Sequence, residues 1–118
     1  MKENDHVVDI TNTEHYEWGD CCEGWHFLKS ETLSVIRERM PGLSKEQLHY
    51  HSKAQQFFYI LSGEALFKID GSSYIVSPGK GISIKPGIKH LILNNTVDDL
   101  EFLVISEPPS RGDRVDID

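Results

Sequence analysis

Short runs rich in valine, isoleucine, leucine, phenylalanine and tyrosine recur along the chain, separated by glycine, proline, aspartate and serine. Runs of this kind between turn-forming residues are typical of β-strands. The pattern predicts strands at residues 24–28, 33–40, 47–51, 56–61, 65–69, 73–76, 81–84, 89–93 and 100–106. Several short strands at such spacing indicate an all-β sandwich or barrel.

Helical periodicity is weak along the whole chain, so very little helix is expected. The best helical candidate, residues 31–40, is interpreted as a strand because Leu33, Val35 and Ile36 lie in a β-favouring run that ends at Pro41. The Asp70-Gly71 pair is the firmest hairpin signal, since this dipeptide suits a two-residue turn between antiparallel strands.

The run at residues 56–61 is apolar on both faces, because alternate side chains of a strand point to opposite sides of the sheet. One face can line the interior of a barrel. The other needs cover from a second sheet layer, from the N-terminal segment or from a partner subunit. We therefore expect a homodimer whose subunits cover each other's outer sheets, the alternative being a leader that folds back on its own barrel.

The length of 118 residues fits one domain with a single core, and 38% hydrophobic with 26% charged residues indicates a compact globular chain. The expected organisation is a polar leader at 1–23, packed on the barrel or on a partner, a barrel at 24–107 and a tail at 108–118. Pro108 and Pro109 are expected to end the last strand, because proline cannot extend a ladder of hydrogen bonds.

The charge balance restricts the partners of the chain. There are 12 lysines and arginines against 19 acidic residues, a net charge of −7, which disfavours nucleic acid and membrane partners. Residues 1–10 lack the pattern of a signal peptide, and no stretch approaches the roughly 20 apolar residues of a membrane span. Cys21 and Cys22 are interpreted as reduced thiols, with a vicinal disulfide or a soft-metal pair as alternatives. A cytoplasmic location is expected.

Three of the six histidines fall into a pattern with chemical meaning. His49 and His51 lie two residues apart on a predicted strand, which places both rings on one face and suits two neighbouring ligands of one metal ion. His90 lies further along, after Pro86 and Gly87. Taken alone, the His-x-His pair is a weak signal for a metal, and two histidines on a solvated face are the more common alternative.

The spacing around the pair is more specific. Gly42 is followed by six residues, then His49 and His51, four residues, Gln56, six residues and Gly63. This series resembles the first motif of the cupin superfamily, in which a glycine precedes His-x-His by five residues and a glutamate stands at the position of Gln56.

A second series agrees with it. Gly79 is followed by five residues, Lys85-Pro86-Gly87, two residues, His90, three residues and Asn94. It is similar to the second cupin motif with the proline moved by one position. Fifteen residues separate Gly63 from Gly79, as in small single-domain cupins.

The resemblance implies an antiparallel jelly-roll barrel, the double-stranded β-helix, holding a divalent transition metal. His49, His51 and His90 match the family's histidine ligands. Gln56 replaces the family's glutamate and has two possible roles: ligation through its amide oxygen, which would leave the site more positive, or a hydrogen bond to a histidine or water beside a three-histidine site. Iron, zinc, nickel, copper and manganese all suit imidazole-rich sites.

A pocket beside the metal is expected to be largely apolar. If Gln56 and His90 point inward, Phe58, Ile60 and Ile92 do so too. On the strand at 33–40 we expect the inward set to be Ile36, Glu38 and Met40. That orientation makes Glu38 a candidate acid or base, the alternative being a surface salt bridge. Asn94 is expected to be structural, and Tyr16, Trp18 and Trp25 to seal the outer sheet.

Three functions remain open at this point. The first is an enzyme that uses a metal for dioxygenation, isomerisation or a lyase reaction on a small metabolite with an oxygen donor such as a carboxylate, enolate or catecholate. The second is a non-enzymatic module that binds or senses such a molecule, and the third is a barrel that keeps its metal ligands but has lost its reaction. Fold alone does not decide between them.

Overall fold

The computed structural model describes residues 6–118, and within them eleven strands and no helix are formed. The same residues therefore offer no helix long and apolar enough to cross a membrane. The strands are β1 (Glu14–Trp18), β2 (Cys22–Lys29), β3 (Ser34–Met40), β4 (His49–His51), β5 (Gln55–Ser62), β6 (Ala65–Ile69), β7 (Ser72–Val76), β8 (Gly81–Ile84), β9 (His90–Leu93), β10 (Leu100–Glu107) and β11 (Arg114–Asp116).

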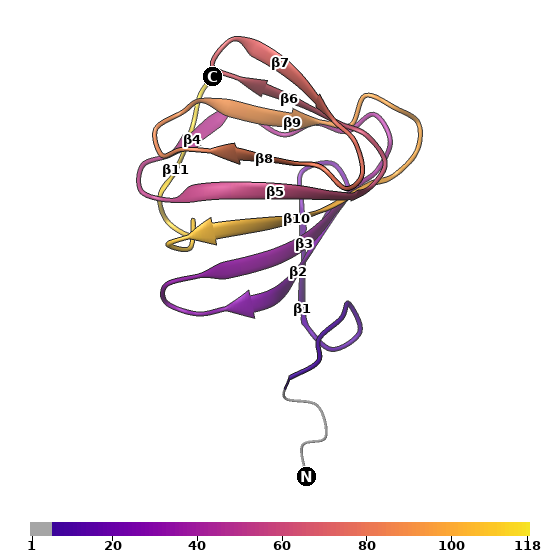
Figure 1. The fold of residues 1–118 in the computed structure, drawn as a ribbon, viewed down its shortest axis with the longest axis vertical. Helices are drawn as coiled ribbons and strands as arrows, with labels where there is room; N and C mark the ends of the chain where they lie inside the picture. The colour runs from indigo at the N-terminus through magenta and orange to yellow at the C-terminus, as the bar shows by residue number, and fades with distance from the viewer. Residues whose placement is uncertain (1–5) are drawn as a thin grey trace.

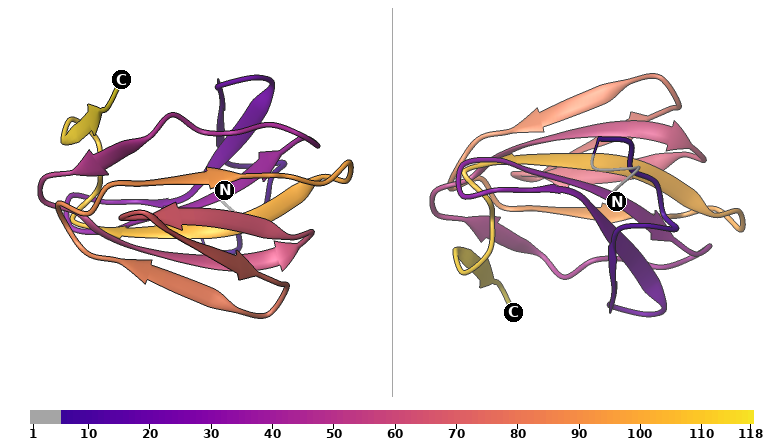
Figure 2. Two further views of the ribbon diagram at one scale, coloured as in Figure 1. Left: turned by 90° about the horizontal axis from the view of Figure 1, so that it is seen from above. Right: turned by 90° about the horizontal axis from the view of Figure 1, so that it is seen from below.

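The strands form two antiparallel sheets that face each other (Figures 1 and 2). One sheet has the order β1-β2-β3-β10-β5-β8, and the other has the order β11-β4-β9-β6-β7. Neighbours that are distant in sequence, such as β3 with β10 and β4 with β9, give the crossovers of a jelly roll. The predicted all-β jelly-roll fold is confirmed.

The core lies between the sheets and follows from the period-two pattern of the strands. In β5, Gln56, Phe58 and Ile60 are buried, whereas Phe57 and Tyr59 point outward and are about 40% exposed. The ring of Phe58 lies 5.0 Å from that of Phe67 on the opposite sheet. Burial of these aromatic side chains joins the two sheets, each contributing on the order of 2–3 kcal/mol.

The hairpin predicted at Asp70-Gly71 is present between β6 and β7, where Ile69 pairs with Ser72. Both turn residues have positive φ, 51° for Asp70 and 88° for Gly71, as a type I′ turn requires. The predicted strand at 33–40 is also present as β3, so the helical alternative for that stretch is excluded.

The sheets extend beyond the expected barrel at both ends. Residues 14–18, assigned to the leader, form β1 and pair with β2, and residues 114–116, assigned to the tail, form β11 and pair with β4. The polar side chains of both segments hid this pairing, since the sequence signal for a strand is apolar. Residues 1–5 of the expected leader lie outside the described residues.

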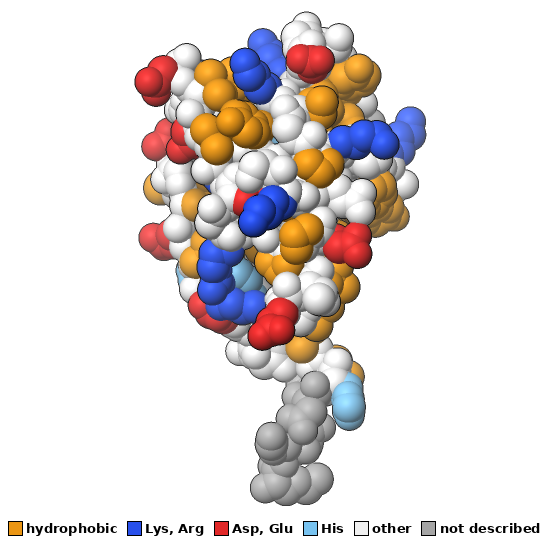
Figure 3. Space-filling model, turned by 90° about the vertical axis from the view of Figure 1, so that its left-hand side faces the viewer, with side chains coloured by type: hydrophobic (Ala, Val, Ile, Leu, Met, Phe, Trp, Pro, Cys, Tyr) orange, Lys and Arg blue, Asp and Glu red, His pale blue; other side chains and the backbone are white. Residues whose placement is uncertain are grey.

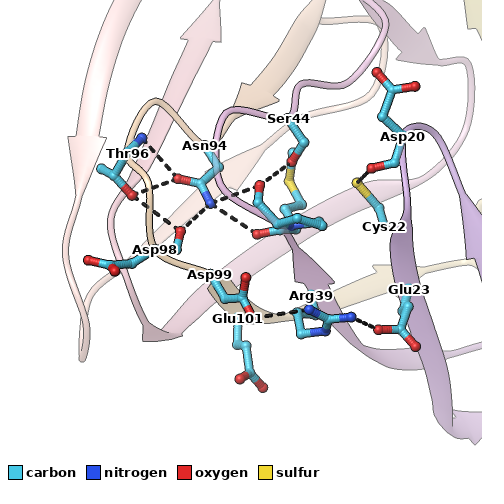
Figure 4. A network of polar contacts seen from close by, with 12 residues as sticks. Asp20, Cys22, Glu23, Arg39, Ser44, Asn94, Thr96, Asp98, Asp99 and Glu101 are labelled. Carbon is cyan, nitrogen blue, oxygen red and sulfur yellow. Dashed lines mark hydrogen bonds and ion pairs between the residues drawn. The ribbon is translucent and has the colours of Figure 1, made fainter.

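A polar network fixes the barrel end near Asn94 (Figure 4). The Asn94 amide donates to the backbone oxygens of Met40, Pro41 and Asp98, and its oxygen accepts two bonds from Thr96. The expected structural role of Asn94 agrees with these contacts. Arg39 forms ion pairs with Glu23 on one side and Asp99 on the other in the same view.

Candidate metal centre

Three buried histidine rings converge inside the barrel. His49 and His51 come from β4, and His90 lies directly opposite His49 on the neighbouring strand β9. Their ring centroids lie 4.3 to 6.0 Å apart, and one nitrogen from each ring lies within 4.8 Å of the other two. The three histidines predicted to share a site are therefore brought together.

The same nitrogen of each ring is engaged outside the cluster. Nδ1 of His49 lies 2.8 Å from the carbonyl oxygen of Gln47, and Nδ1 of His90 lies 2.8 Å from that of Ile88. Nδ1 of His51 lies 2.8 Å from a carboxylate oxygen of Asp113. A carbonyl can only accept, so Nδ1 of His49 and of His90 carries the proton, which leaves each Nε2 as a lone-pair donor suited to a metal.

Burial keeps the rings of His49 and His90 neutral. Burial lowers the pKa of His49 to about 3 and lowers the pKa of His90 as well, since the charged imidazolium is poorly solvated there. Asp113 stays ionised: burial opposes its charge, but the backbone N–H of Ala54 and the ring of His51 hold its pKa below the ordinary value. The set therefore consists of three imidazole rings that two carbonyls and a carboxylate orient.

Two buried polar atoms at the cluster lack a partner in the described residues. Nε2 of His90 is buried without a hydrogen bond, and so is Oε1 of Gln56. The Gln56 amide is anchored through its nitrogen, which donates to Ser106 Oγ at 3.1 Å from the paired position on β10. Because an unsatisfied buried acceptor costs roughly 1–3 kcal/mol, these atoms fit a cation that would accept their lone pairs.

A buried carboxylate that the sequence did not reveal stands beside the cluster. Glu46 Oε2 lies 3.8 Å from His49 Nε2 and 3.2 Å from an Arg114 nitrogen. Burial raises the pKa of Glu46 to about 7, although the charge of Arg114 opposes the rise. Glu46 and Arg114 together place one negative and one positive group at the edge of the histidines.

The cluster opens into a cavity of about 320 Å³. Phe58 lines it as predicted, together with Ile36 and Glu38 of the inward-facing set of β3. The other expected wall residues, Met40, Ile60 and Ile92, belong to the buried core and not to the cavity wall. The expected apolar pocket is thus wrong in part, since its wall is mixed: Tyr16, Trp18, Ile36, Glu38, Glu46, His49, His51, Gln56, Phe58, Val104, Ser106, Ser110, Arg111, Gly112 and Arg114.

Glu38 and Tyr16 form a pair within this wall. The Tyr16 hydroxyl donates to Glu38 Oε2 at 2.6 Å, reaching across β2 from β1 to β3. Gly24 of β2 lies between them, and a side chain there would meet the Tyr16 ring, since an added Cβ would lie 2.2 Å from it. Burial raises the pKa of Glu38 to about 8, the charge of Glu46 adds to the rise, and the bond from Tyr16 opposes it.

The contributions of Tyr16 and Trp18 to the cavity correct the expectation that they seal the outer sheet. Asp113 and Arg114 were also missed, because they lie in the expected tail. The sequence signal that could have indicated a role at the cavity was the polar and charged character of residues 110–116, which is unusual for a segment that only packs on an apolar core.

Comparison with known proteins identifies the family of the chain and supports its fold. A model of the cupin domain matches residues 35–106. An uncharacterized protein of Methanocaldococcus jannaschii is 33% identical over 89 residues, which cover 75% of this chain and 71% of the relative. The oxalate-binding protein of Thermotoga maritima is 33% identical over 85 residues, which cover 68% of this chain and 70% of the relative.

Solved structures give the same architecture. The structure of a "predicted oxalate decarboxylase" from Thermotoga maritima has a TM-score of 0.79 at 24% identity, covering 88% of this chain and 100% of that one. The polyketide cyclase RemF from Streptomyces resistomycificus has a TM-score of 0.81 at 15% identity, covering 96% and 85%. At these identities the likeness is one of fold. With the family model matching more than half of its length, the chain belongs to the cupin family.

Proposed function

We propose that this cupin binds one divalent transition metal and, through it, a small anionic molecule with an oxygen donor such as a carboxylate, enolate or catecholate. The observation that carries the proposal is the convergence of three buried histidines whose Nδ1 atoms are all engaged elsewhere, with Nε2 of His90 left unpartnered.

His49, His51 and His90 would hold the metal, with Gln56 Oε1 as a neutral fourth donor. When bound, the metal supplies a Lewis acid that attracts anionic oxygen ligands. Four neutral donors leave the full charge of a dication uncompensated, and this favours an anion in the remaining positions. Iron, zinc, nickel, copper and manganese are all compatible with such donors.

The surroundings support an anion. The cavity wall includes the guanidinium groups of Arg111 and Arg114, although Arg114 is shared with Glu46. Trp18, Phe58 and Val104 supply apolar wall that limits the access of water and strengthens charge interactions. A relative at 33% identity is named for binding oxalate, which is a dianion with four oxygen donors.

The direct test is calorimetric titration of oxalate into metal-free and metal-loaded protein. The proposal predicts binding only in the loaded form and loss of that binding in His51→Ala. The matched control is His6→Ala, which removes an exposed histidine outside the site. Equal binding to both forms would reduce the metal to a structural role and overturn the proposal.

A second candidate function, a metal-dependent enzyme, is favoured by Glu38. Its carboxyl group lines the same cavity, is bonded to the Tyr16 hydroxyl and has a pKa of about 8, so it can accept or donate a proton near neutral pH. Consumption of a bound acid or enol, with or without O₂, that is lost in Glu38→Gln while binding persists would establish this candidate. Binding without consumption would leave the non-enzymatic module.

We also propose that the chain works as a cytoplasmic homodimer. The unpaired state of Cys21 and Cys22 is consistent with a reducing compartment. The outward Phe57 and Tyr59 of β5 stand beside Ile105 and Leu103 of β10, which makes an apolar outer face on the six-stranded sheet.

A further inference from the structure

A second and larger cavity, of about 700 Å³, adjoins the cavity of about 320 Å³ beside the histidine cluster, which we call the metal pocket. We name the larger cavity the basic annex. It is formed by β2, the turn to β3, the connection between β4 and β5 and the segment after β10, which gather on the left-hand side of Figure 1. Its lining residues are His26, Lys29, Ser30, Glu31, Ser34, Ile36, Lys53, Pro108, Pro109, Ser110 and Arg111.

The annex and the metal pocket share wall residues. Ile36, Ser110 and Arg111 line both cavities, so the two spaces meet at these side chains. The ring of His26, which lines the annex, lies 5.0 Å from the ring of Tyr16, which lines the metal pocket. The combined volume of the two cavities lies at the upper end of the roughly 300–1,000 Å³ range of small-molecule sites. This is far more than a two-carbon diacid fills.

Positive charge is concentrated around the annex although the chain as a whole carries −7. Lys29, Lys53 and Arg111 line it against one carboxylate, Glu31. Figure 3 views this end of the molecule, where Lys and Arg side chains lie over a partly covered histidine.

Two of these cations form no close ion pair with the described residues. Lys29 is paired with Glu14 at 3.0 Å, but within residues 6–118 the side chains of Lys53 and Arg111 make no hydrogen bond or ion pair. Nδ1 of His26 is also buried without a partner. Unpaired cations beside an unpartnered polar atom can be satisfied by an anionic group entering the annex.

We infer that the ligand of this protein is an elongated dianion, with one anionic oxygen donor at the histidine cluster, an apolar middle against Ile36 and a second anionic group, carboxylate or phosphate-like, in the annex near Lys53 and Arg111. The inference rests on the proposed metal-dependent anion binding and specifies its ligand. Oxalate then fills only the inner half of the site.

The test compares four probes on metal-loaded protein by calorimetry: oxalate, adipate, the matched monoanion hexanoate and 5-phosphonopentanoate. Adipate or 5-phosphonopentanoate is expected to bind at least about tenfold more tightly than hexanoate, because only the dianions reach the annex cations. The tighter of the two identifies the second anionic group as carboxylate or phosphonate, and either result supports the inference.

The variant Lys53→Gln is expected to remove most of the dianion preference while leaving the affinity for hexanoate within about twofold. The matched control is Lys68→Gln, which changes an exposed lysine of β6 that lines neither cavity. Both variants change exposed side chains, so folding is preserved.

The outcomes separate this inference from the proposed function. Oxalate binding to loaded protein without any preference for the long dianions would overturn the inference and leave the proposed function standing. The same holds if Lys53→Gln and Lys68→Gln behave alike. Equal binding of adipate to metal-free and metal-loaded protein would also overturn the inference, because it requires one end of the ligand at the metal. Failure of every probe to bind the loaded protein would contradict the proposed function itself.

Discussion

Gln56 is the residue in which this chain departs most clearly from the cupin pattern, and its surroundings give the departure a physical consequence. Its amide nitrogen donates to Ser106, and its oxygen is buried without a partner among residues 6–118. An amide oxygen is a weaker donor for a dication than a carboxylate, and it leaves more positive charge for an incoming anion.

The substitution Gln56→Glu should therefore have two effects of opposite sign. If Gln56 is a ligand, the added negative charge tightens metal binding, on the order of tenfold, and weakens the binding of oxalate to the loaded protein. Chelator competition measures the first effect and calorimetry the second. Unchanged or weaker metal binding would assign Gln56 the alternative role of a hydrogen-bond partner.

Glu38 gives a pH-dependent prediction. The groups around it are the Tyr16 hydroxyl from β1, the Glu46 carboxyl, the Arg114 guanidinium from β11 and, from β2, the Cys22 thiol, whose pKa the charge of Glu38 raises in addition to burial. Its pKa of about 8 in the folded protein lies above its ordinary value of 4.5, so the native state holds a proton that the unfolded chain releases. Stability contributed by this group is present below pH 4.5 and is lost as the pH rises through 8.

In Glu38→Gln this loss is absent, because the amide carries no charge and its oxygen can still accept from Tyr16. The free energy of unfolding of the metal-free variant, relative to that of the wild type, should rise by on the order of 4 kcal/mol between pH 5 and pH 9. Urea titrations at the two pH values measure it. A difference that stays constant with pH would show that Glu38 is not held protonated by burial.

At the scale of the elements, the three-strand unit β1-β2-β3 shapes one wall of the cavity. Gly24 of β2 pairs with Tyr16 on one side and Glu38 on the other, and its missing side chain lets the tyrosine ring lie across the strand. Sequence alone marked Gly24 only as the start of a strand, because its partner Tyr16 lies at residues 14–18, which were expected to belong to the leader.

The substitution Gly24→Ala should displace Tyr16 from Glu38 and cost about 1–3 kcal/mol of unfolding free energy, through loss of a partly buried hydrogen bond and its packing. A double-mutant cycle with Tyr16→Ala isolates the cause, since without the ring the added methyl group meets nothing large. Equal costs of Gly24→Ala in the two backgrounds would contradict the steric account.

Strand β11 is the second element that sequence could not place. His49 and His51 follow from the period of two, and His90 from the motif spacing, since both are local properties of the chain. The contact of His51 with Asp113 joins residues 62 positions apart, and that of Glu46 with Arg114 joins residues 68 apart. Only the pairing of β11 with β4 brings them together, so the three histidines were predictable and the residues around them were not.

At the scale of the whole molecule, the two-sided pattern of residues 56–61 was interpreted correctly for the inner face, where Gln56, Phe58 and Ile60 are buried. Phe57 and Tyr59 keep an outer face that is about 40% exposed. Strand β1 of the N-terminal segment does not cover this face. It lies at the opposite edge of the sheet from β8, which neighbours β5.

The proposed homodimer follows from this face. Light scattering at micromolar concentration should give twice the chain mass of 13.5 kDa. Tyr59→Glu should shift the species toward monomer, because a charge would be buried in the interface, whereas Tyr74→Glu on β7 of the other sheet should not. A wild-type protein that scatters only as a 13.5 kDa species would reject the dimer.

The central claim is that the three histidines hold a metal ion, and elemental analysis of purified protein tests it most directly. Protein produced in medium replete with iron, zinc, nickel, copper and manganese should carry about one divalent transition metal per chain, as a single cluster of three imidazoles allows. Occupancy should fall at least about tenfold in His49→Ala, His51→Ala and His90→Ala and stay unchanged in His6→Ala. Wild-type protein without transition metal, or a His90→Ala variant with full occupancy, would contradict the account.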